Sequence, residues 1–152
     1  MSEAWTLHTD GGARGNPGPA GIGAVLRDPR GNVVSEISQA IGWTTNNVAE
    51  YQGLIVGLQV AADQGARSIE VYMDSLLVVQ QMKGVFKVKN EGLKPLHVKA
   101  KELLAPFDMV RFYAIPREKN AHADRLMNKG IDDAEAAGDF AAPPVVPQQQ
   151  LF

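Results

Sequence analysis

The fold is set by residues 5–18, which read Trp5-Thr6-Leu7-His8-Thr9-Asp10-Gly11-Gly12-Ala13-Arg14-Gly15-Asn16-Pro17-Gly18. A short hydrophobic run ends on Asp10, and a turn rich in Gly, Asn and Pro follows at once. Residues 5–9 therefore predict a first strand that brings Asp10 to its end, close to a loop of bare backbone amides. This pairing suits a metal-bound carboxylate beside a polyanion, although one Asp before two glycines is also ordinary turn chemistry.

The composition is that of one globular domain. The chain has 152 residues, of which 45% are apolar, and this is enough to bury a core. It has no cysteine, which excludes disulfides and thiolate metal sites and favours a reducing compartment. No basic and apolar leader is evident, and no apolar run approaches the roughly 20 residues that span a bilayer. We therefore expect a cytoplasmic protein without a membrane contact, and a monomer by default.

Charge is distributed unevenly along the chain. The formal net charge is −2, but four acids and no Lys or Arg follow Lys129. Between residues 83 and 101 the balance is reversed, with six lysines and one glutamate. The lysines are Lys83, Lys87, Lys89, Lys94, Lys99 and Lys101. Such a patch can follow a phosphate backbone, while a solvated helix face and loop is the ordinary alternative.

The residue pattern predicts a meander of three strands, followed by helices and two more strands. The first strands are expected at residues 5–9, 21–26 and 33–40, on short connections. A helix is expected through about residue 64, with N-cap chemistry at residues 44–47 and Gly65 closing it. The later elements are a strand at 68–73, a helix at 75–83, a loop at 84–92, a helix at 93–104, a strand at 109–115, a turn at 116–120 and a helix at 121–137. This order predicts an α/β domain over residues 1–140, and residues 141–152 are expected to form a flexible Pro/Gln-rich tail.

Four acids lie at or near the ends of these elements, and each has an ordinary structural role available. Asp10 could serve its turn, and Asp74 could cap the following helix. Glu50 follows Asn47 by three residues, which is the spacing of a capping box. Asp124 in the first turn of the last helix would complement the helix dipole.

The four acids can form one site if the first and fourth strands are neighbours. All four carboxylates can then converge on one rim, where their mutual repulsion is unfavourable unless cations bind. Oxygen ligands without Cys or paired His select Mg²⁺ or Mn²⁺ over zinc. Two such ions roughly 3.5–4 Å apart can activate water and stabilise the leaving oxygen of a phosphoryl displacement. The pattern therefore indicates metal-dependent phosphodiester hydrolysis.

Five separated motifs, in order, resemble type 1 ribonuclease H in its short bacterial or archaeal-like form without the basic protrusion. They are Asp10-Gly11-Gly12 with Gly15-Asn16-Pro17-Gly18, Thr44-Thr45-Asn46-Asn47-Val48-Ala49-Glu50, Asp74-Ser75, Val88-Lys89-Asn90 and Asn120-Ala121-His122-Ala123-Asp124. The resemblance covers residues 5 to about 137. It implies a ribonuclease H-like α/β fold, in which helices flank a five-stranded mixed sheet of three antiparallel and then two parallel strands. The implied activity is endonucleolytic cleavage of the RNA strand of RNA–DNA hybrids, leaving 3′-hydroxyl and 5′-phosphate ends, in support of primer and R-loop removal.

The resemblance also implies a role for individual residues. Asp10, Glu50, Asp74 and Asp124 would be catalytic and would bind two Mg²⁺, with Mn²⁺ as a substitute and Asp10 bridging both ions. The residues implied to lie along the RNA are Gly11, Gly12, Ala13, Arg14, Asn16, Asn46, Asn47 and Ser75. Thr45 and Asn90 would hold a DNA phosphate, and Phe86 would pack on a deoxyribose, where a 2′-hydroxyl would clash. Hybrid specificity would then come from shape and sugar readout, without a base code.

The chain departs from the family pattern in two places. Many relatives carry a long basic insertion after the short second helix, where this chain has only residues 84–89, so weaker or more salt-sensitive binding is expected. Longer relatives also place a histidine on a loop before the last Asp. Arg117 is the better candidate to assist the leaving group here, while His122 is more simply a surface residue of the helix. His8 and His97 are expected in packing or on the surface.

The C-terminal residues 148–152 form a Gln-x-x-Leu-Phe sequence, with Gln148, Leu151 and Phe152 at the fixed positions. It resembles the short peptide by which bacterial replication and repair proteins dock on the sliding clamp. An extended tail ending in Leu-Phe could fill a hydrophobic pocket. A low-complexity tail without a partner is the alternative.

Three other functions stay open beside a hybrid-specific ribonuclease H. One is a catalytically silent hybrid-binding module, which the intact set of acids argues against. Another is a different nuclease or a transposase on the same fold. Such enzymes usually carry added domains, and the chain is short for them. The last is an enzyme that also cuts double-stranded RNA, which the missing insertion leaves open.

Overall fold

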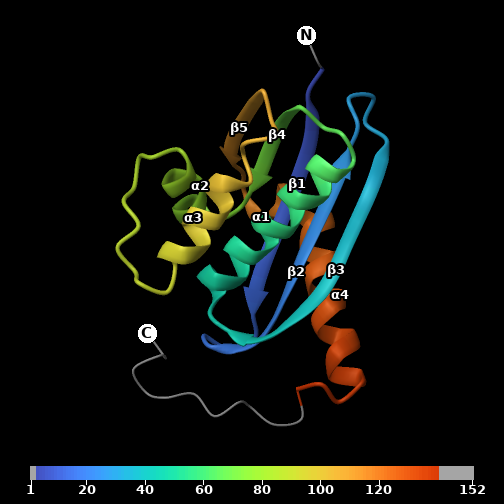
Figure 1. Ribbon diagram of the computed structural model, residues 1–152. Helices are drawn as coiled ribbons and strands as arrows, with labels where there is room; N and C mark the ends of the chain where they lie inside the picture. The colour runs from blue at the N-terminus through green and yellow to red at the C-terminus, as the bar shows by residue number, and fades with distance from the viewer. Residues whose placement is uncertain (1–2, 141–152) are drawn as a thin grey trace.

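One mixed sheet of five strands, in the order β3-β2-β1-β4-β5, organises the structure (Figure 1). The computed structural model describes residues 3–140, so the interpretation of Gln148, Leu151 and Phe152 lies outside the described residues. The strands are β1 (Trp5–Ala13), β2 (Gly18–Arg27), β3 (Val33–Thr44), β4 (Ser68–Met73) and β5 (Met109–Ala114). The helices are α1 (Asn46–Asp63), α2 (Leu76–Met82), α3 (Lys94–Glu102) and α4 (Ala121–Ala136), with a short 3₁₀ turn at Arg117–Lys119.

The pairing of the strands confirms the predicted fold class. The strand pairs β1–β2 and β2–β3 are antiparallel, whereas β1–β4 and β4–β5 are parallel. The first and fourth strands are therefore neighbours, which is the condition for the convergence of the acids. Parallel neighbours end at the same edge of a sheet, so Asp10 and Asp74 are delivered to one rim.

The first three strands are longer than predicted, and this corrects the position of Asp10. Asp10 lies inside β1, opposite Gly23, and residues 11–13 continue the ladder opposite residues 20–22 of β2. Glycines weaken an isolated strand, which is why the pattern predicted a strand end after residue 9. The antiparallel ladder with β2 supplies the hydrogen bonds that extend the strand, so the loop shrinks to residues 14–17.

The helix ends confirm some local predictions and correct others. Thr45 caps α1 by accepting a hydrogen bond from the Val48 N–H, and Gly65 follows the helix with a φ of 90°, as a closing glycine should. Glu50 is the fifth residue of α1 and lies beyond its first turn, so the alternative role in a capping box does not hold. Ser75, and not Asp74, caps α2, which leaves the Asp74 carboxylate for another use.

Helices cover both faces of the sheet. Helices α1, α2 and α3 lie on one face, and α4 crosses the other face over β2 and β3 (Figure 1). The main core lies under α1 and includes the fully buried Leu7, Leu54, Leu58, Ile69 and Val71. No helix within residues 3–140 is long and apolar enough to cross a membrane.

Two glycines let the helices approach the sheet very closely. A Cβ on Gly11 of β1 would overlap the Ala49 carbonyl of α1, and a Cβ on Gly23 of β2 would overlap the Ala123 carbonyl of α4. Ala49 precedes Glu50, and Ala123 precedes Asp124. The same close contacts therefore press the two helical acids toward the strand that carries Asp10.

Candidate active site

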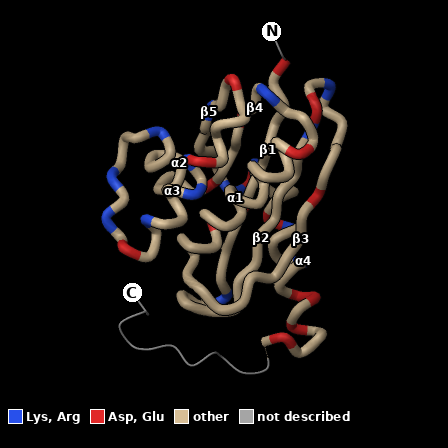
Figure 2. The backbone as a smooth tube through the Cα atoms, in the orientation of Figure 1, with Lys and Arg blue, Asp and Glu red and all other residues tan. Residues whose placement is uncertain are grey.

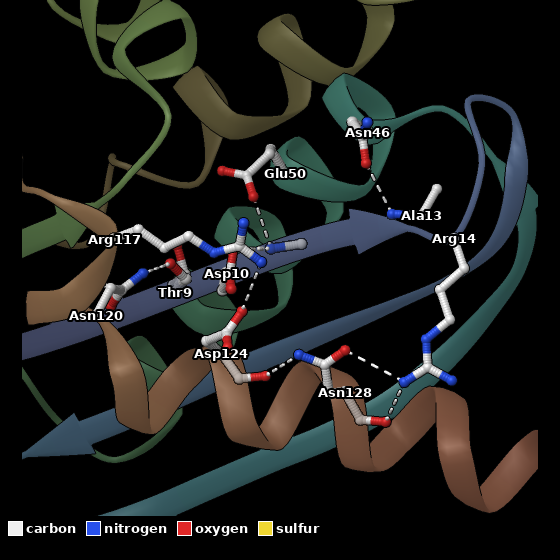
Figure 3. Close-up of polar contacts among 11 residues, drawn as sticks. Thr9, Asp10, Ala13, Arg14, Asn46, Glu50, Arg117, Asn120, Asp124 and Asn128 are labelled. Carbon is white, nitrogen blue, oxygen red and sulfur yellow. Dashed lines mark hydrogen bonds and ion pairs between the residues drawn. The ribbon is translucent and has the colours of Figure 1, made fainter.

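Three of the four predicted acids meet at one point. The carboxylates of Asp10, Glu50 and Asp74 each place an oxygen within 4.8 Å of the others. Asp10 comes from β1, Asp74 directly follows β4, and Glu50 comes from α1. The fourth acid, Asp124, lies in the first turn of α4, and Figure 3 shows Asp10 between Glu50 and Asp124. The predicted convergence is confirmed for the first three acids, and Asp124 borders the group from the other face of the sheet.

A backbone amide joins two of the acids. The Gly11 N–H donates to Glu50 Oε1 at 2.8 Å and to Asp10 Oδ1 at 2.9 Å. Because α1 sits so close to β1 at Gly11, the Glu50 side chain reaches the strand without leaving its helix. The arrangement fixes one oxygen of each carboxylate. Glu50 Oε2 is buried and has no hydrogen-bond partner among the described residues.

The position of Asp124 depends on a residue that the sequence interpretation used only as part of a motif. Asn120 is buried, and its side-chain amide donates to the Thr9 carbonyl of β1 at 2.9 Å (Figure 3). This bond ties the start of α4 to the strand residue that precedes Asp10. Asp124 follows one turn later and lies 3.6 Å from the Arg117 guanidinium. Asn120 is therefore a positioning residue of the site.

Burial and mutual repulsion raise the pKa values of the clustered acids. The pKa of Asp10 is raised to about 7, first by burial and then by the neighbouring Asp74 and Asp124 carboxylates, with the hydrogen bond involving Glu50 opposing the shift. Burial, together with the Asp10 carboxylate, holds the pKa of Glu50 well above its usual range. The pKa of Asp74 is raised by burial, against which Arg117 acts. Clustered acids with raised pKa values are typical of functional sites.

The acids have the donor set of a divalent-cation site. All their donor atoms are carboxylate oxygens, which Mg²⁺ and Mn²⁺ prefer, and the described part of the chain brings no sulfur ligand to them. Glu50 Oε2 is a buried oxygen without a hydrogen-bond partner within residues 3–140, and Asp124 Oδ1 has there only the Arg117 guanidinium, at 3.6 Å. Unpaired buried oxygens are costly unless a cation satisfies them. The residues present therefore fit such a metal ion.

Asp10, Glu50 and Asp74, but not Asp124, line a pocket of about 540 Å³ that also holds part of the predicted substrate set. Its wall includes Gly11, Gly12, Ala13, Arg14, Asn46 and Ser75 from that set, together with Arg117. Asn16, Thr45, Asn47, Phe86 and Asn90 do not line this pocket. Sequence reasoning missed Met127, Asn128 and Ile131, which also line it. Their spacing of three, four and seven residues from Asp124, on one face of α4, was the signal that could have found them.

Several residues of the predicted RNA contact hold each other in place. Asn46 Oδ1 accepts from the Ala13 N–H at 2.8 Å, and Asn16 Oδ1 accepts from the Asn46 N–H at 3.0 Å. The two asparagines thus clamp the β1–β2 loop to the start of α1. Arg14 is held against α4 by ion pairs to Asp132 at 2.7 Å and Glu135 at 3.1 Å. Its guanidinium also bonds Asn128, as Figure 3 shows.

Two of the predicted DNA contacts, Phe86 and Asn90, lie on a different part of the molecule, whereas Thr45 directly precedes the pocket residue Asn46. Phe86 and Asn90 belong to the loop between α2 and α3, and Phe86 is 42% exposed. Basic side chains gather along this loop, whereas the end of α4 is acidic (Figure 2). The exposed Phe86 and Asn90 are accompanied by the exposed Lys87 and Lys89.

His8 and His122 contact other side chains of the protein, which agrees with the expectation that the histidines serve in packing or on the surface. His122 Nε2 lies 2.6 Å from Glu36 Oε2, and its Nδ1 lies 3.0 Å from the Arg27 guanidinium. These partners belong to β2 and β3, so the described contacts of His122 are not with the clustered acids. His8 stacks on Tyr72, and burial lowers its pKa to about 4. Arg117, 3.6 Å from Asp124, is a basic group that lines the pocket.

Known proteins are similar to this chain in sequence and in fold. The family model that matches residues 8–130 is described as reverse transcriptase-like. A bifunctional protein of Mycobacterium tuberculosis is 48% identical over 139 residues, which is 91% of this chain and 38% of that protein. Ribonuclease HI of Halobacterium salinarum is 45% identical over 125 residues, which is 82% of this chain and 63% of that protein. The chain thus spans less than two thirds of the length of these two relatives.

One solved structure is similar over nearly its whole length. It is LC11-RNase H1 in complex with an RNA/DNA hybrid, which is 48% identical, covers 86% of this chain and 99% of its own, and superposes with a TM-score of 0.82.

Proposed function

Because the chain belongs to the type 1 ribonuclease H family, we propose that it hydrolyses the RNA strand of RNA–DNA hybrids with the help of divalent metal ions. The observation that carries the proposal is the convergence of Asp10, Glu50 and Asp74 within 4.8 Å. Binding alone has no need to crowd carboxylates against a phosphate, so the cluster favours an enzyme over a silent binding module. The hybrid bound by the similar LC11-RNase H1 supports the choice of substrate.

The four acids are the proposed ligands of two Mg²⁺ or Mn²⁺ ions, with Asp10 shared between them. When bound, such ions would activate a water molecule and stabilise the leaving oxygen, which yields 3′-hydroxyl and 5′-phosphate ends. The acids hold this position through the Gly11 amide and through Asn120, which anchors the start of α4. Arg117 is the proposed group that assists the leaving oxygen, since its guanidinium lies 3.6 Å from Asp124.

We propose that Asn46 in the pocket reads the ribose strand, while Thr45 and Phe86, which do not line the pocket, contact the DNA strand. Asn46 uses its carbonyl oxygen to accept from Ala13, so its NH₂ group is the part that can donate to a ribose hydroxyl. The Thr45 oxygen accepts from the Val48 N–H, which leaves the hydroxyl proton for a DNA phosphate. Phe86 offers an exposed ring to a deoxyribose. A ribose 2′-hydroxyl both donates and accepts, which suits the Asn amide on the RNA side.

A cleavage assay on matched duplexes tests the proposal. The protein is incubated with labelled RNA–DNA hybrid, double-stranded RNA and double-stranded DNA, each with Mg²⁺, Mn²⁺ or EDTA. We expect cleavage of the RNA strand of the hybrid with either metal and none in EDTA. Extension of the cut RNA by a polymerase would verify a 3′-hydroxyl end. Asp63→Asn, which removes an exposed acid at the end of α1, is the charge-matched control for changes at Asp10.

The other outcomes separate the alternatives. Hybrid binding without cleavage in either metal would identify a silent binding module and contradict the proposal. Cleavage of double-stranded RNA at a similar rate would broaden the substrate. Cleavage confined to double-stranded DNA would point to another nuclease on the same fold.

A further inference from the structure

A buried tyrosine stands next to Glu50 and faces away from the carboxylates. Tyr51 is fully buried between α1, α2 and α3. Its hydroxyl donates to Gln81 Oε1 of α2 at 2.6 Å, and His97 Nδ1 of α3 lies 3.3 Å from the same tyrosine oxygen. The Tyr51 and His97 rings meet edge to face, with centroids 6.2 Å apart. One side chain on the helix of Glu50 thus joins three helices.

The protons of this group can be assigned from its partners. Tyr51 has one hydroxyl proton, which the short contact to Gln81 Oε1 uses, so His97 must supply its Nδ1–H to the tyrosine oxygen. Burial raises the pKa of Tyr51 to about 12, so the hydroxyl keeps its proton. With Gln81 Oε1 turned to Tyr51, the Gln81 NH₂ group faces the other way and donates to the Lys87 carbonyl at 3.5 Å. Gln81 is 4% exposed, so each end of its amide depends on a protein partner.

The Lys87 carbonyl belongs to the loop between α2 and α3. The start of that loop folds back on α2, where the Val85 and Phe86 N–H groups both donate to the Gln80 carbonyl at 2.9 and 3.1 Å. Further along, Val88 packs against the core. The Gln81 amide holds the backbone between these two anchors, at the residue after Phe86.

We propose that Tyr51 and Gln81 are positioning residues that fix the α2–α3 loop, so that Phe86 and Asn90 are presented to the DNA strand of the hybrid. This inference rests on the proposed function and adds to it a connection from the interior to the substrate surface. Neither side chain lines the pocket of the acids. The network therefore sets the KM for the hybrid and leaves kcat in place.

Two isosteric substitutions test the network on the full chain. Tyr51→Phe removes only the hydroxyl, and Gln81→Met removes both hydrogen bonds of the amide at similar volume. We expect each to raise the KM for the hybrid by about three- to tenfold, the range that corresponds to one net hydrogen bond, with kcat within about twofold of the wild type. Ile69→Val, a small loss in the core of β4, is the control for general destabilisation and should leave KM unchanged.

A double-mutant cycle with Phe86→Ala distinguishes positioning from a structural role. If Gln81 acts through the loop, Gln81→Met should add little to the KM of the Phe86→Ala variant. Full additivity of the two changes would overturn the inference, as would a KM that neither single substitution alters, or a fall in kcat at constant KM. Hybrid binding in EDTA repeats the comparison without catalysis.

A wild-type chain that binds but does not cleave would contradict the proposed function alone, whereas one that cleaves with KM insensitive to both substitutions would contradict the inference alone. A wild-type chain that does neither would overturn both.

Discussion

The carboxylate pocket and the α2–α3 loop are built in opposite ways. In the pocket, the Asp10 and Glu50 side chains are buried, carried on a strand and a helix, and pressed together where Gly11 and Gly23 admit the helices. In the loop, Phe86 and the neighbouring lysines are exposed, and the backbone is held by a few hydrogen bonds to α2. The pocket brings together the carboxylates of Asp10, Glu50 and Asp74, whereas lysines gather along the loop (Figure 2). Under the proposed function, the chemistry belongs to the buried pocket and hybrid affinity to the exposed loop.

Removing one charge from the pocket should give the largest effect. Asp10→Asn is expected to lower hybrid cleavage by roughly a thousandfold or more, since it takes a ligand from both proposed ions. Hybrid binding should be retained, because the loop is untouched. Cleavage rates and binding in EDTA, measured beside Asp63→Asn, check both parts. Activity close to that of the wild type would remove Asp10 from the site.

The acids should also make the metal-free protein less stable as the pH rises. The folded-state pKa of Asp10 is about 7 against an ordinary value of 3.8, so between these values the folded state holds a proton that the unfolded state has released. The free energy of unfolding in EDTA should therefore be highest below about pH 4 for this group, and fall by on the order of 2–4 kcal/mol as the pH rises through about 7.

Urea unfolding across this pH range, with and without Mg²⁺, measures the effect. Asp10→Asn should flatten the pH dependence in EDTA, and Mg²⁺ should restore stability to the wild type above about pH 7, where Asp10 has lost its proton. If the free energy of unfolding of Asp10→Asn depends on pH as steeply as that of the wild type, groups other than Asp10 cause the slope.

A methyl group added where α4 meets the sheet should lower the free energy of unfolding far more than one added in the α2–α3 loop. Gly23→Ala places a Cβ on the Ala123 carbonyl, so it should cost about 1–3 kcal/mol in the free energy of unfolding and also lower cleavage by displacing Asp124. In the loop, a Cβ on Gly92 meets only the Asn90 side-chain oxygen at 3.1 Å. Gly92→Ala is therefore the matched control, with a much smaller expected loss. Equal losses in thermal unfolding would argue that both regions are packed alike.

Lysines of the loop should show the smallest effect, and only in the salt dependence of binding. Lys87→Gln with Lys89→Gln should reduce the slope of log affinity against log salt by about 0.7–0.9 for each phosphate that a lysine no longer neutralises, with kcat unchanged. Lys129→Gln, whose ammonium pairs with Asp133 on α4, is the control outside the loop. An unchanged slope would show that the loop lysines do not meet phosphates.

The predictions from sequence succeeded where a signal was local. The Thr45 cap and Gly65 bound α1 as predicted, and the strand at residues 68–73 has the predicted limits. The predictions failed where the local structure depends on contacts with residues distant in the sequence. Glycines predicted a strand end after residue 9, but pairing with β2 carries β1 through Ala13. The spacing of Glu50 left a capping box open as an alternative, but its carboxylate accepts from the Gly11 amide of β1.

The sequence by itself determined the fold class and the family and singled out four candidate acids, because strand alternation, helix caps and ordered motifs are written in neighbouring residues. Only the tertiary structure decided how these acids meet. Asp10, Glu50 and Asp74 are far apart in the chain, and their distances depend on parallel pairing of β1 with β4 and on the close approach of α1 at Gly11. The sequence likewise did not reveal that Asn120 anchors the start of α4 near Asp124, or that Gln81 holds the α2–α3 loop. The hydrogen-bond partner of each side chain is set by packing.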